Sequence, residues 1–254
     1  MNVRNLCDLS GRVALVTGAR SGIGQAISVM LAEAGADVVG VGRQAMAETA
    51  ALVAATGRRF HAIQSDIGSL DSAEPLVAET LSVFGRFDIL VNAAGITHRQ
   101  PAIDCPIDKF DLVMDTNIRA AFVLSQAAAR HFRTQPSAGR IILIASMLTF
   151  QGGVNVMPYA VSKSGIAGLV RALANEWAGL GINVNAIAPG YIATDMTKPI
   201  QDDPVRNPQI LARIPANRWG KPRDIAGLAV FLASDAAAYC HGSIYPVDGG
   251  WLSR

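Results

Sequence analysis

The sequence has few cysteines and little charge. Its three cysteines, Cys7, Cys105 and Cys240, lie far apart and form no Cys-x-x-Cys pair, so they predict neither a disulfide framework nor a zinc or other metal site. Charged residues make up 17% of the chain and leave a net charge of only +2, and Arg58-Arg59 is the single adjacent basic pair. We therefore expect no binding of nucleic acid and no attraction to an acidic membrane surface.

Long hydrophobic runs are also absent. Apolar stretches such as residues 141–144 end far short of the roughly 20 residues that a membrane-spanning helix needs. Residues 1–11 contain no apolar run like that of a signal peptide. Because free thiols suit a reducing compartment, we expect a cytoplasmic protein. No repeat or linker divides the chain, which predicts one globular domain over residues 1–254.

Short apolar runs alternate with longer helical patterns along almost the whole chain. Several runs are continuously apolar, as expected of strands whose two faces are both covered by helices. The pattern predicts an α/β protein with a single doubly wound parallel sheet, a Rossmann fold, flanked by helices. The expected strands are residues 13–16, 38–41, 60–64, 89–91, 140–145, 184–188 and 242–247, and the expected helices are residues 22–34, 45–55, 73–84, 110–132 and 159–178.

Residues 194–215 interrupt this alternation. The segment is polar and rich in Asp, Asn and Pro, which favours a loop. In a doubly wound fold such an insertion lies near the active-site edge, so we expect it to form a lid.

A glycine-rich motif follows the first expected strand. The segment from Thr17 to Gly24 reads Thr-Gly-Ala-Arg-Ser-Gly-Ile-Gly, a GxxxGxG variant of the dinucleotide fingerprint. Glycines permit a tight turn and a close approach of the backbone to a pyrophosphate, and the next helix offers free N–H groups to the phosphates. A glycine-rich turn without a ligand is the alternative, but the position between strand and helix favours a cofactor.

The end of the second strand indicates which nucleotide binds. NAD sites commonly place an acidic residue there for the ribose hydroxyls, whereas NADP sites place a cation for the 2′-phosphate. This chain has Gly42-Arg43 and no acidic residue before Glu48, and Arg20 could supply a second positive charge. The pattern favours NADP over NAD, and both remain open because Arg43 could be a solvated surface residue.

Tyr159 and Lys163 form a candidate catalytic pair. They are four residues apart in a helical stretch and therefore share a face. A neighbouring ammonium stabilises a phenolate and lowers its pKa, which would make Tyr159 a general acid/base. Ser146 follows the fifth expected strand, and its hydroxyl could bind the reacting oxygen. Each residue alone could be structural.

The motifs together resemble the short-chain dehydrogenase/reductase family over essentially the whole chain. The resemblance implies hydride transfer between NAD(P)(H) and a ketone or secondary alcohol, with Tyr159 as acid/base, Ser146 positioning the carbonyl and Lys163 binding the nicotinamide ribose. It also implies that Asn117 holds a water in a proton relay. The motifs in chain order are Thr17-Gly18-x-x-x-Gly22-x-Gly24, Asn92-Ala93-Ala94-Gly95, Asn117, Ser146, Tyr159-x-x-x-Lys163 and Pro189-Gly190.

The resemblance extends the cofactor site beyond the glycine loop. Asp66 would contact the adenine, and Asn92 would shape the cleft unless it is a purely structural strand contact. Ala93 departs mildly from the family pattern, in which Asn is commoner. The predicted cofactor-binding residues are Gly18, Arg20, Ser21, Gly22, Ile23, Gly24, Arg43, Asp66, Ile67, Asn92, Ala93, Gly95, Tyr159, Lys163, Pro189, Gly190, Ile192 and Thr194.

Within the family, the chain is most similar to dehydrogenases of keto-deoxy sugar acids. Such a substrate needs a cation for its carboxylate. Arg99, beside His98 in the loop after Asn92–Gly95, could bind it in a bidentate manner, although it could also be a solvated loop residue. Gln151 could reach sugar hydroxyls or cap a turn, and Arg218 could lie at a subunit contact.

Two alternative functions remain at this point. A 3-oxoacyl-thioester reductase would share the same catalytic set, and a non-catalytic nucleotide-binding regulator would share the fold. The joint presence of Ser146, Tyr159, Lys163 and Asn117 disfavours the regulator. The family resemblance also implies a homotetramer, and apolar residues on more than one face of residues 165–178 agree with burial against a partner.

Overall fold

The computed structural model describes residues 6–69, 72–137 and 139–254. These residues form one seven-stranded sheet with the order β3-β2-β1-β4-β5-β6-β7, and every neighbouring pair is parallel. The predicted doubly wound parallel sheet is therefore confirmed. The strands are β1 (Val13–Thr17), β2 (Asp37–Gly42), β3 (Phe60–Gln64), β4 (Ile89–Asn92), β5 (Gly139–Ile144), β6 (Ile182–Pro189) and β7 (Ile244–Val247).

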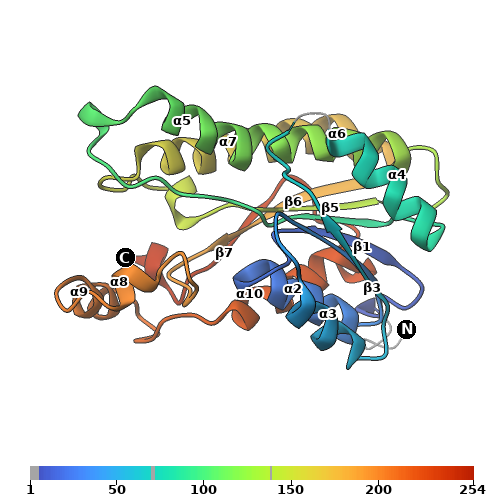
Figure 1. The fold of residues 1–254 in the computed structure, drawn as a ribbon, viewed down its shortest axis with the longest axis horizontal. Coiled ribbons are helices and arrows are strands. Elements are labelled where there is room, and N and C mark those ends of the chain that lie inside the picture. Colours follow the sequence, from blue (N-terminus) through green and yellow to red (C-terminus); the bar gives the residue numbers. More distant parts are fainter. Residues whose placement is uncertain (1–5, 70–71, 138) are drawn as a thin grey trace.

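Helices cover both faces of the sheet (Figure 1). On one face, Val13 and Leu15 of β1 pack in a core with residues of α4, α6 and α7; on the other face, Ala14 and Val16 pack with residues of α2, α3 and α10. Alternate residues of one strand are thus equally buried, which explains why its sequence is continuously apolar. The helices are α2 (Gly22–Glu33), α3 (Ala47–Ala54), α4 (Ala73–Phe84), α5 (Ile107–Met114), α6 (Ala120–Phe132), α7 (Met157–Trp177), α8 (Lys198–Gln201), α9 (Arg206–Arg213) and α10 (Pro222–Ala233).

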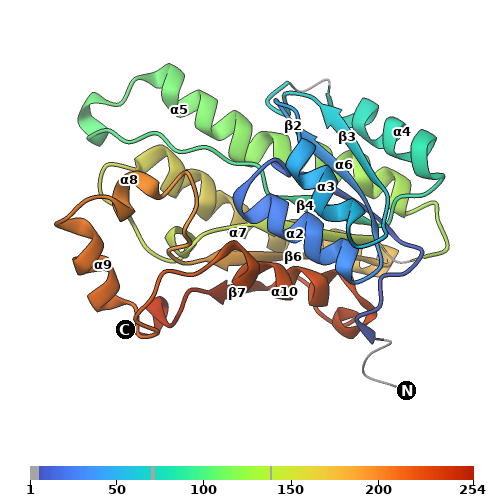
Figure 2. The same cartoon turned by 60° about the horizontal axis from the view of Figure 1, so that its bottom comes forward.

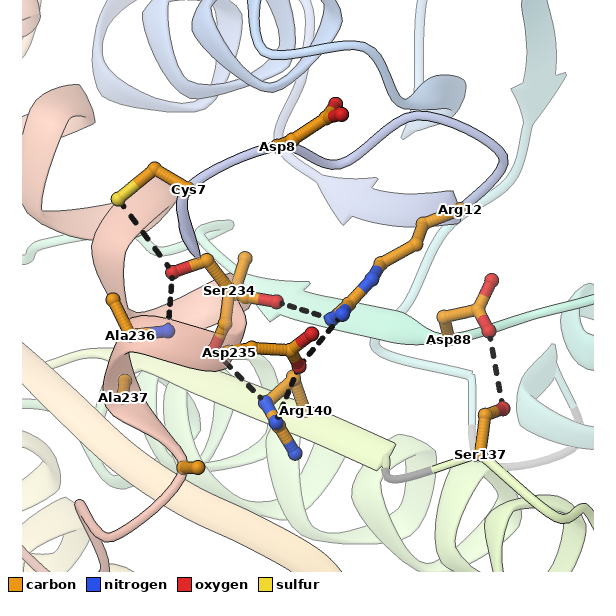
Figure 3. Close-up of polar contacts among 12 residues, drawn as sticks. Cys7, Asp8, Arg12, Asp88, Ser137, Arg140, Ser234, Asp235, Ala236 and Ala237 are labelled. Carbon is orange, nitrogen blue, oxygen red and sulfur yellow. Dashed lines mark hydrogen bonds and ion pairs between the residues drawn. The ribbon is translucent and has the colours of Figure 1, made fainter. Parts of the chain in front are cut away.

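A polar network holds the amino-terminal edge of the sheet together (Figure 3). The guanidinium of Arg12, just before β1, donates to the Ala233 carbonyl at 3.0 Å and to the Asp235 carboxylate at 2.7 Å. Arg140 of β5 is buried and donates to Asn183 of β6 at 2.7 Å and to Asp235 at 3.3 Å. Arginines at this edge are therefore paired within the protein, and their role is structural.

The prediction of a loop at residues 194–215 is wrong, because α8 and α9 lie within it. Two of the four prolines that suggest a loop, Pro199 and Pro208, lie in the first turns of these helices, where a missing N–H costs little. Asp203 accepts hydrogen bonds from the backbone N–H groups of Val205 and Arg206 at 2.9 and 3.0 Å, and so caps the start of α9. The buried side chains Ile210 and Ile214 then anchor the segment to the rest of the protein.

Other element boundaries differ from expectation by a few residues. The helical stretch expected from residue 110 begins at Ile107, and the last strand begins at Ile244 instead of residue 242. Among the described residues, no helix combines the length and the apolar character needed to cross a membrane.

Candidate active site

A cleft of about 640 Å³ opens at the carboxyl ends of the strands. It lies where β1 contacts both β2 and β4, the point at which the strand order reverses and where open α/β sheets bind ligands. All the predicted cofactor-binding residues except Asn92 line this cleft, and so does Ser146. The lining also includes Gly42 and Ala94, which the sequence motifs contain, and residues that the sequence analysis does not assign to the site: Val41, Gln44, Ser65, Gly68, Ile96, Leu112, Asp115, Thr116, Ile144, Ala145, Asp195, Met196 and Thr197.

The glycine loop is shaped by two close backbone approaches. Gly18 has a φ of +69°, and a Cβ there would lie 2.9 Å from the Ala94 backbone. A Cβ on Gly24 would collide with the Gly18 carbonyl. Thr17, at the end of β1, accepts hydrogen bonds on its Oγ1 from the N–H groups of Ala93 and Ala94, each at 3.1 Å. The loop after β1 is therefore fixed against the loop after β4.

The cleft fits a dinucleotide that carries a 2′-phosphate. Ser21, the N-cap residue of α2, makes no side-chain hydrogen bond to the first turn of the helix. The backbone N–H groups of that turn are therefore available to phosphate oxygens. Arg20 and Arg43 both line the cleft, and neither makes an ion pair within the described residues. Asp66 also lines it, with its carboxylate accepting a hydrogen bond from the Gly68 N–H at 3.0 Å.

Ser146, Tyr159 and Lys163 meet at one wall of the cleft. Ser146 lies two residues beyond β5 and accepts a hydrogen bond on Oγ from the Leu148 N–H at 3.2 Å, so its own hydroxyl proton can be donated toward the cleft. The Lys163 ammonium donates to the Ile144 carbonyl at 2.6 Å and lies 5.6 Å from the centre of the Tyr159 ring. Thr149 donates to the Lys163 carbonyl at 2.9 Å and so ties the Ser146 turn to α7.

Burial dominates the electrostatics of this wall. It raises the pKa of Tyr159, while a hydrogen bond with Ser146 and the nearby Arg99 guanidinium act in the opposite direction. Burial also lowers the pKa of Lys163 to about 8. In this arrangement Arg99 is thus a cation that favours ionisation of Tyr159. The sequence pattern suggests Lys163 for the same role. At neutral pH the tyrosine is a protonated acid and the lysine is mostly charged.

Asn117 lies in a π-helical turn, Asp115–Arg119, between α5 and α6. Its Oδ1 accepts from the Ile96 N–H at 2.8 Å, and its Nδ2 donates to the Ile96 carbonyl at 2.9 Å and to Ser162 Oγ at 3.0 Å. The wide turn places this side chain against the loop after β4, behind the cleft lining. Its predicted role in a proton relay stays a prediction.

The remaining candidates lie in different surroundings. Asn92 is buried and donates to Ser125 Oγ at 3.1 Å, which matches the structural alternative. His98 shares a 3.0 Å hydrogen bond with Gln100. Gln151 lies outside the cleft lining and accepts from Arg213 at 3.5 Å. Arg218 pairs with Asp224 at 2.6 Å, beside the start of α10. None of these contacts reaches the catalytic trio.

A Rossmann fold with a tyrosine, serine and lysine at its nucleotide cleft defines an NAD(P)-dependent oxidoreductase. Comparison with known proteins agrees: residues 18–252 match the family described as enoyl-(acyl carrier protein) reductase. The 2-dehydro-3-deoxy-D-gluconate 5-dehydrogenase of Dickeya dadantii is 50% identical over 252 residues, which cover 99% of this chain and all of that protein. The chain belongs to the short-chain dehydrogenase/reductase family.

Two solved structures extend the comparison. A candidate 2-deoxy-D-gluconate 3-dehydrogenase from Agrobacterium tumefaciens with bound NADP is 49% identical, with a TM-score of 0.93 and coverage of 98% of this chain and 100% of that one. A gluconate 5-dehydrogenase from Burkholderia cenocepacia in complex with NADP and tartrate is 33% identical, with a TM-score of 0.95 and full coverage of both chains.

Proposed function

We propose that this chain is an NADP-linked dehydrogenase/reductase of a keto-deoxy sugar acid. The reaction would interconvert a secondary alcohol and a ketone, as at C5 of 2-dehydro-3-deoxy-D-gluconate or of a 4-deoxy-5-keto-uronate. The observation that carries the proposal is the catalytic wall itself: the half-buried Tyr159 lines the cleft together with Ser146 and Lys163, and its pKa responds to the Arg99 guanidinium. The sugar-acid dehydrogenases among its relatives support the substrate class.

The residues suggest how reduction would proceed. Ser146 donates a hydrogen bond from its hydroxyl to the substrate carbonyl and orients it, and Tyr159 transfers a proton to the same oxygen as the carbon is reduced. The bound nicotinamide supplies the hydride. The Lys163 ammonium then stabilises the phenolate left on Tyr159, and in the alcohol-to-ketone direction the phenolate accepts the proton.

The proposed cofactor is NADP. Arg20 and Arg43 supply two positive charges at the end of the cleft next to β2, where Gly42 provides no carboxylate to repel a 2′-phosphate. Bound NADP in two structural neighbours supports the same assignment.

The proposed substrate contacts are Arg99 and Gln151. Arg99 lies close enough to Tyr159 to affect its pKa, so a carboxylate held there would keep the rest of a small sugar acid near the catalytic hydroxyl. Gln151 is available through its amide N–H₂ because its oxygen accepts from Arg213.

We also propose that residues 194–215 act as a lid on a single domain. The two ends of this segment are joined at one point, where Ile192 and Gly220 form a parallel bridge. The Ala193 N–H donates to the Gly220 carbonyl at 2.8 Å, and the Gly220 N–H donates to the Tyr191 carbonyl at 2.9 Å. Figure 2 shows α8 and α9, which lie between these anchors, at the end of the molecule that holds the C-terminus. Such a segment can move about its base without disturbing the sheet, provided that Ile210 and Ile214 leave their contacts with the protein body.

A homotetramer in the cytoplasm completes the proposal. Ile107 of α5 and Val161 of α7 are large apolar residues exposed on the same layer of helices, which supports burial against another subunit. Three free cysteines support a reducing compartment.

The test is cofactor oxidation at 340 nm by the purified protein with a 4-deoxy-5-keto-uronate, run in parallel with NADPH and NADH. Acetoacetyl thioester serves as the control for the 3-oxoacyl reductase alternative. We expect fast turnover of the keto-uronate with NADPH. Turnover of the thioester alone would overturn the substrate, and failure to reduce any ketone would favour the non-catalytic regulator.

A further inference from the structure

A buried threonine in α3 makes polar contacts that neither the cofactor motifs nor the catalytic residues require. Thr49 is fully buried and shares the inner face of this helix with Met46 and Val53, which both pack in the apolar core. Burying a hydroxyl costs free energy unless the group forms hydrogen bonds. A threonine at this position therefore indicates a specific polar partner.

The partners of Thr49 are the glycine loop and a glutamine of α2. The Thr49 hydroxyl donates to the Ala19 carbonyl at 2.8 Å and accepts from the Gln25 side-chain amide at 3.1 Å. The same Gln25 amide donates to the Arg20 carbonyl at 3.2 Å. The peptide groups on both sides of the Arg20 α-carbon are therefore held by side chains of α3 and α2, two helices that lie side by side (Figure 1, Figure 2).

The glycine loop is also fixed to the end of β2, because the Gly18 N–H donates to the Val41 carbonyl at 2.8 Å. Arg20 and Arg43 therefore follow neighbouring backbone segments, and both residues line the cleft. The Arg43 backbone has a separate support, since its carbonyl accepts from the Gln64 side-chain amide at 2.9 Å. The two arginines are thus positioned by different side chains.

The turn at the start of α2, which would bind a pyrophosphate, is held by other contacts. Gly18 approaches the Ala94 backbone so closely that a Cβ would lie 2.9 Å from it, and Gly24 leaves no room for a Cβ beside the Gly18 carbonyl. These contacts join backbone atoms and do not involve the Thr49 hydroxyl. Loss of that hydroxyl should therefore displace Arg20 more than it displaces the phosphate-binding turn.

We propose that Thr49, together with Gln25, is a positioning residue for recognition of the cofactor 2′-phosphate, because it fixes the backbone of Arg20 at the cleft. The inference rests on the proposed NADP assignment, which it deepens by naming two residues that do not line the cleft themselves. A guanidinium whose backbone is fixed before binding loses less conformational entropy when it forms charge-assisted hydrogen bonds with a phosphate. NADH has no phosphate at this position, so its binding should not depend on Thr49.

The test measures the dissociation constants of NADPH and NADH by fluorescence titration, which requires no ketone. For Thr49→Val, which keeps the shape and removes the hydroxyl, we expect NADPH to bind about 5- to 20-fold more weakly and the affinity for NADH to change by less than about threefold. Thr49→Ser should recover most of the loss. Thr80→Val is the matched control, because Thr80 is a fully buried threonine of α4 that donates to the Leu76 carbonyl at 2.7 Å. Equal weakening of both cofactors, or no weakening of NADPH, would overturn the proposal.

A second variant and a double-mutant cycle test the same role if Thr49→Val does not fold or loosens the helix. Gln25→Met keeps the length of a half-buried side chain and removes both of its hydrogen bonds, so NADPH should bind about fivefold more weakly with the affinity for NADH unchanged. In an Arg20→Gln background, Thr49→Val or Gln25→Met should have no further effect on NADPH binding. Additive losses would contradict a role exerted through Arg20.

Failure of the positioning role and failure of the NADP assignment give different results. If the native protein prefers NADPH and both Thr49→Val and Gln25→Met keep the full preference, only the positioning role fails. If the native protein binds NADPH and NADH equally, the NADP assignment itself fails, and the positioning role fails with it.

Discussion

Gly42→Asp should convert the cofactor preference from NADP to NAD. Gly42 is the last residue of β2 and lines the cleft. A Cβ there would meet only Met46 Sδ at 3.6 Å and the Gln44 carbonyl at 4.0 Å, both ordinary contacts, and the backbone is not in the left-handed region. The side chain can therefore be added without strain, so the variant tests electrostatics instead of packing.

The magnitude follows from two charges. A carboxylate about 6 Å from a doubly charged 2′-phosphate, at an effective dielectric constant of about 40, opposes NADPH binding by roughly 3 kcal/mol, or about 100-fold. Hydrogen bonds from the two ribose hydroxyls to the same carboxylate favour NADH by about 1.5 kcal/mol, or about 10-fold. Arg20 and Arg43 would partly neutralise the new charge, so the ratio of the two kcat/KM values should change by about 100- to 1,000-fold.

Initial rates with NADPH and NADH, at a fixed saturating ketone concentration, measure this ratio. Gly42→Asn is the matched control, because it has nearly the same shape as Gly42→Asp and no charge. We expect the Asn variant to stay within about tenfold of the native ratio. If the Asp variant folds and its ratio equals that of the Asn variant, then the end of β2 does not face the ribose, and the argument from Gly42 and Arg43 is refuted.

Three further predictions follow from the site and the fold. Tyr159→Phe should remove the acid/base and lower kcat by at least about 100-fold, while NADPH, followed by fluorescence titration, still binds. If the variant binds NADPH with unchanged affinity and also retains turnover, the assignment of Tyr159 is contradicted. Burial raises the pKa of Tyr159 and lowers that of Lys163 to about 8. The rate of ketone reduction should therefore be constant near neutral pH and fall above pH 8, whereas the rate of alcohol oxidation should rise with pH. Parallel pH profiles of kcat/KM in the two directions would contradict this opposite pH dependence. Asp88→Ala should destabilise the protein by about 3 kcal/mol. The reason is that the buried Asp88 carboxylate accepts hydrogen bonds from the Val13 N–H at 2.9 Å and from the Arg86 guanidinium at 2.6 and 2.8 Å. A denaturation midpoint equal to that of Asp88→Asn would contradict this account.

The fold could be predicted because each strand is buried on both faces. The continuously apolar run of β1 reports a helix layer on either side, and its alternate residues do pack in the two separate cores. The glycine loop could be predicted for a similar reason. Gly18 and Gly24 are required where a Cβ would strike the backbone of a neighbouring segment, so the residue type itself records the close approach.

Features made by contacts between distant segments could not be predicted. The π-helical turn at Asn117 depends on hydrogen bonds to Ile96 and Ser162, and no local pattern marks it. The lid helices resemble loop sequence because their prolines and Asp203 are residues common to turns and to helix starts.

The distribution of arginine partners separates scaffold from site. At the amino-terminal edge of the sheet, Arg12 and Arg140 share the Asp235 carboxylate, so each makes an ion pair within the chain (Figure 3). At the carboxyl edge, Arg20 and Arg43 line the cleft, and neither makes an ion pair within the described residues. An edge that leaves its cations unbalanced is suited to anions from outside the chain.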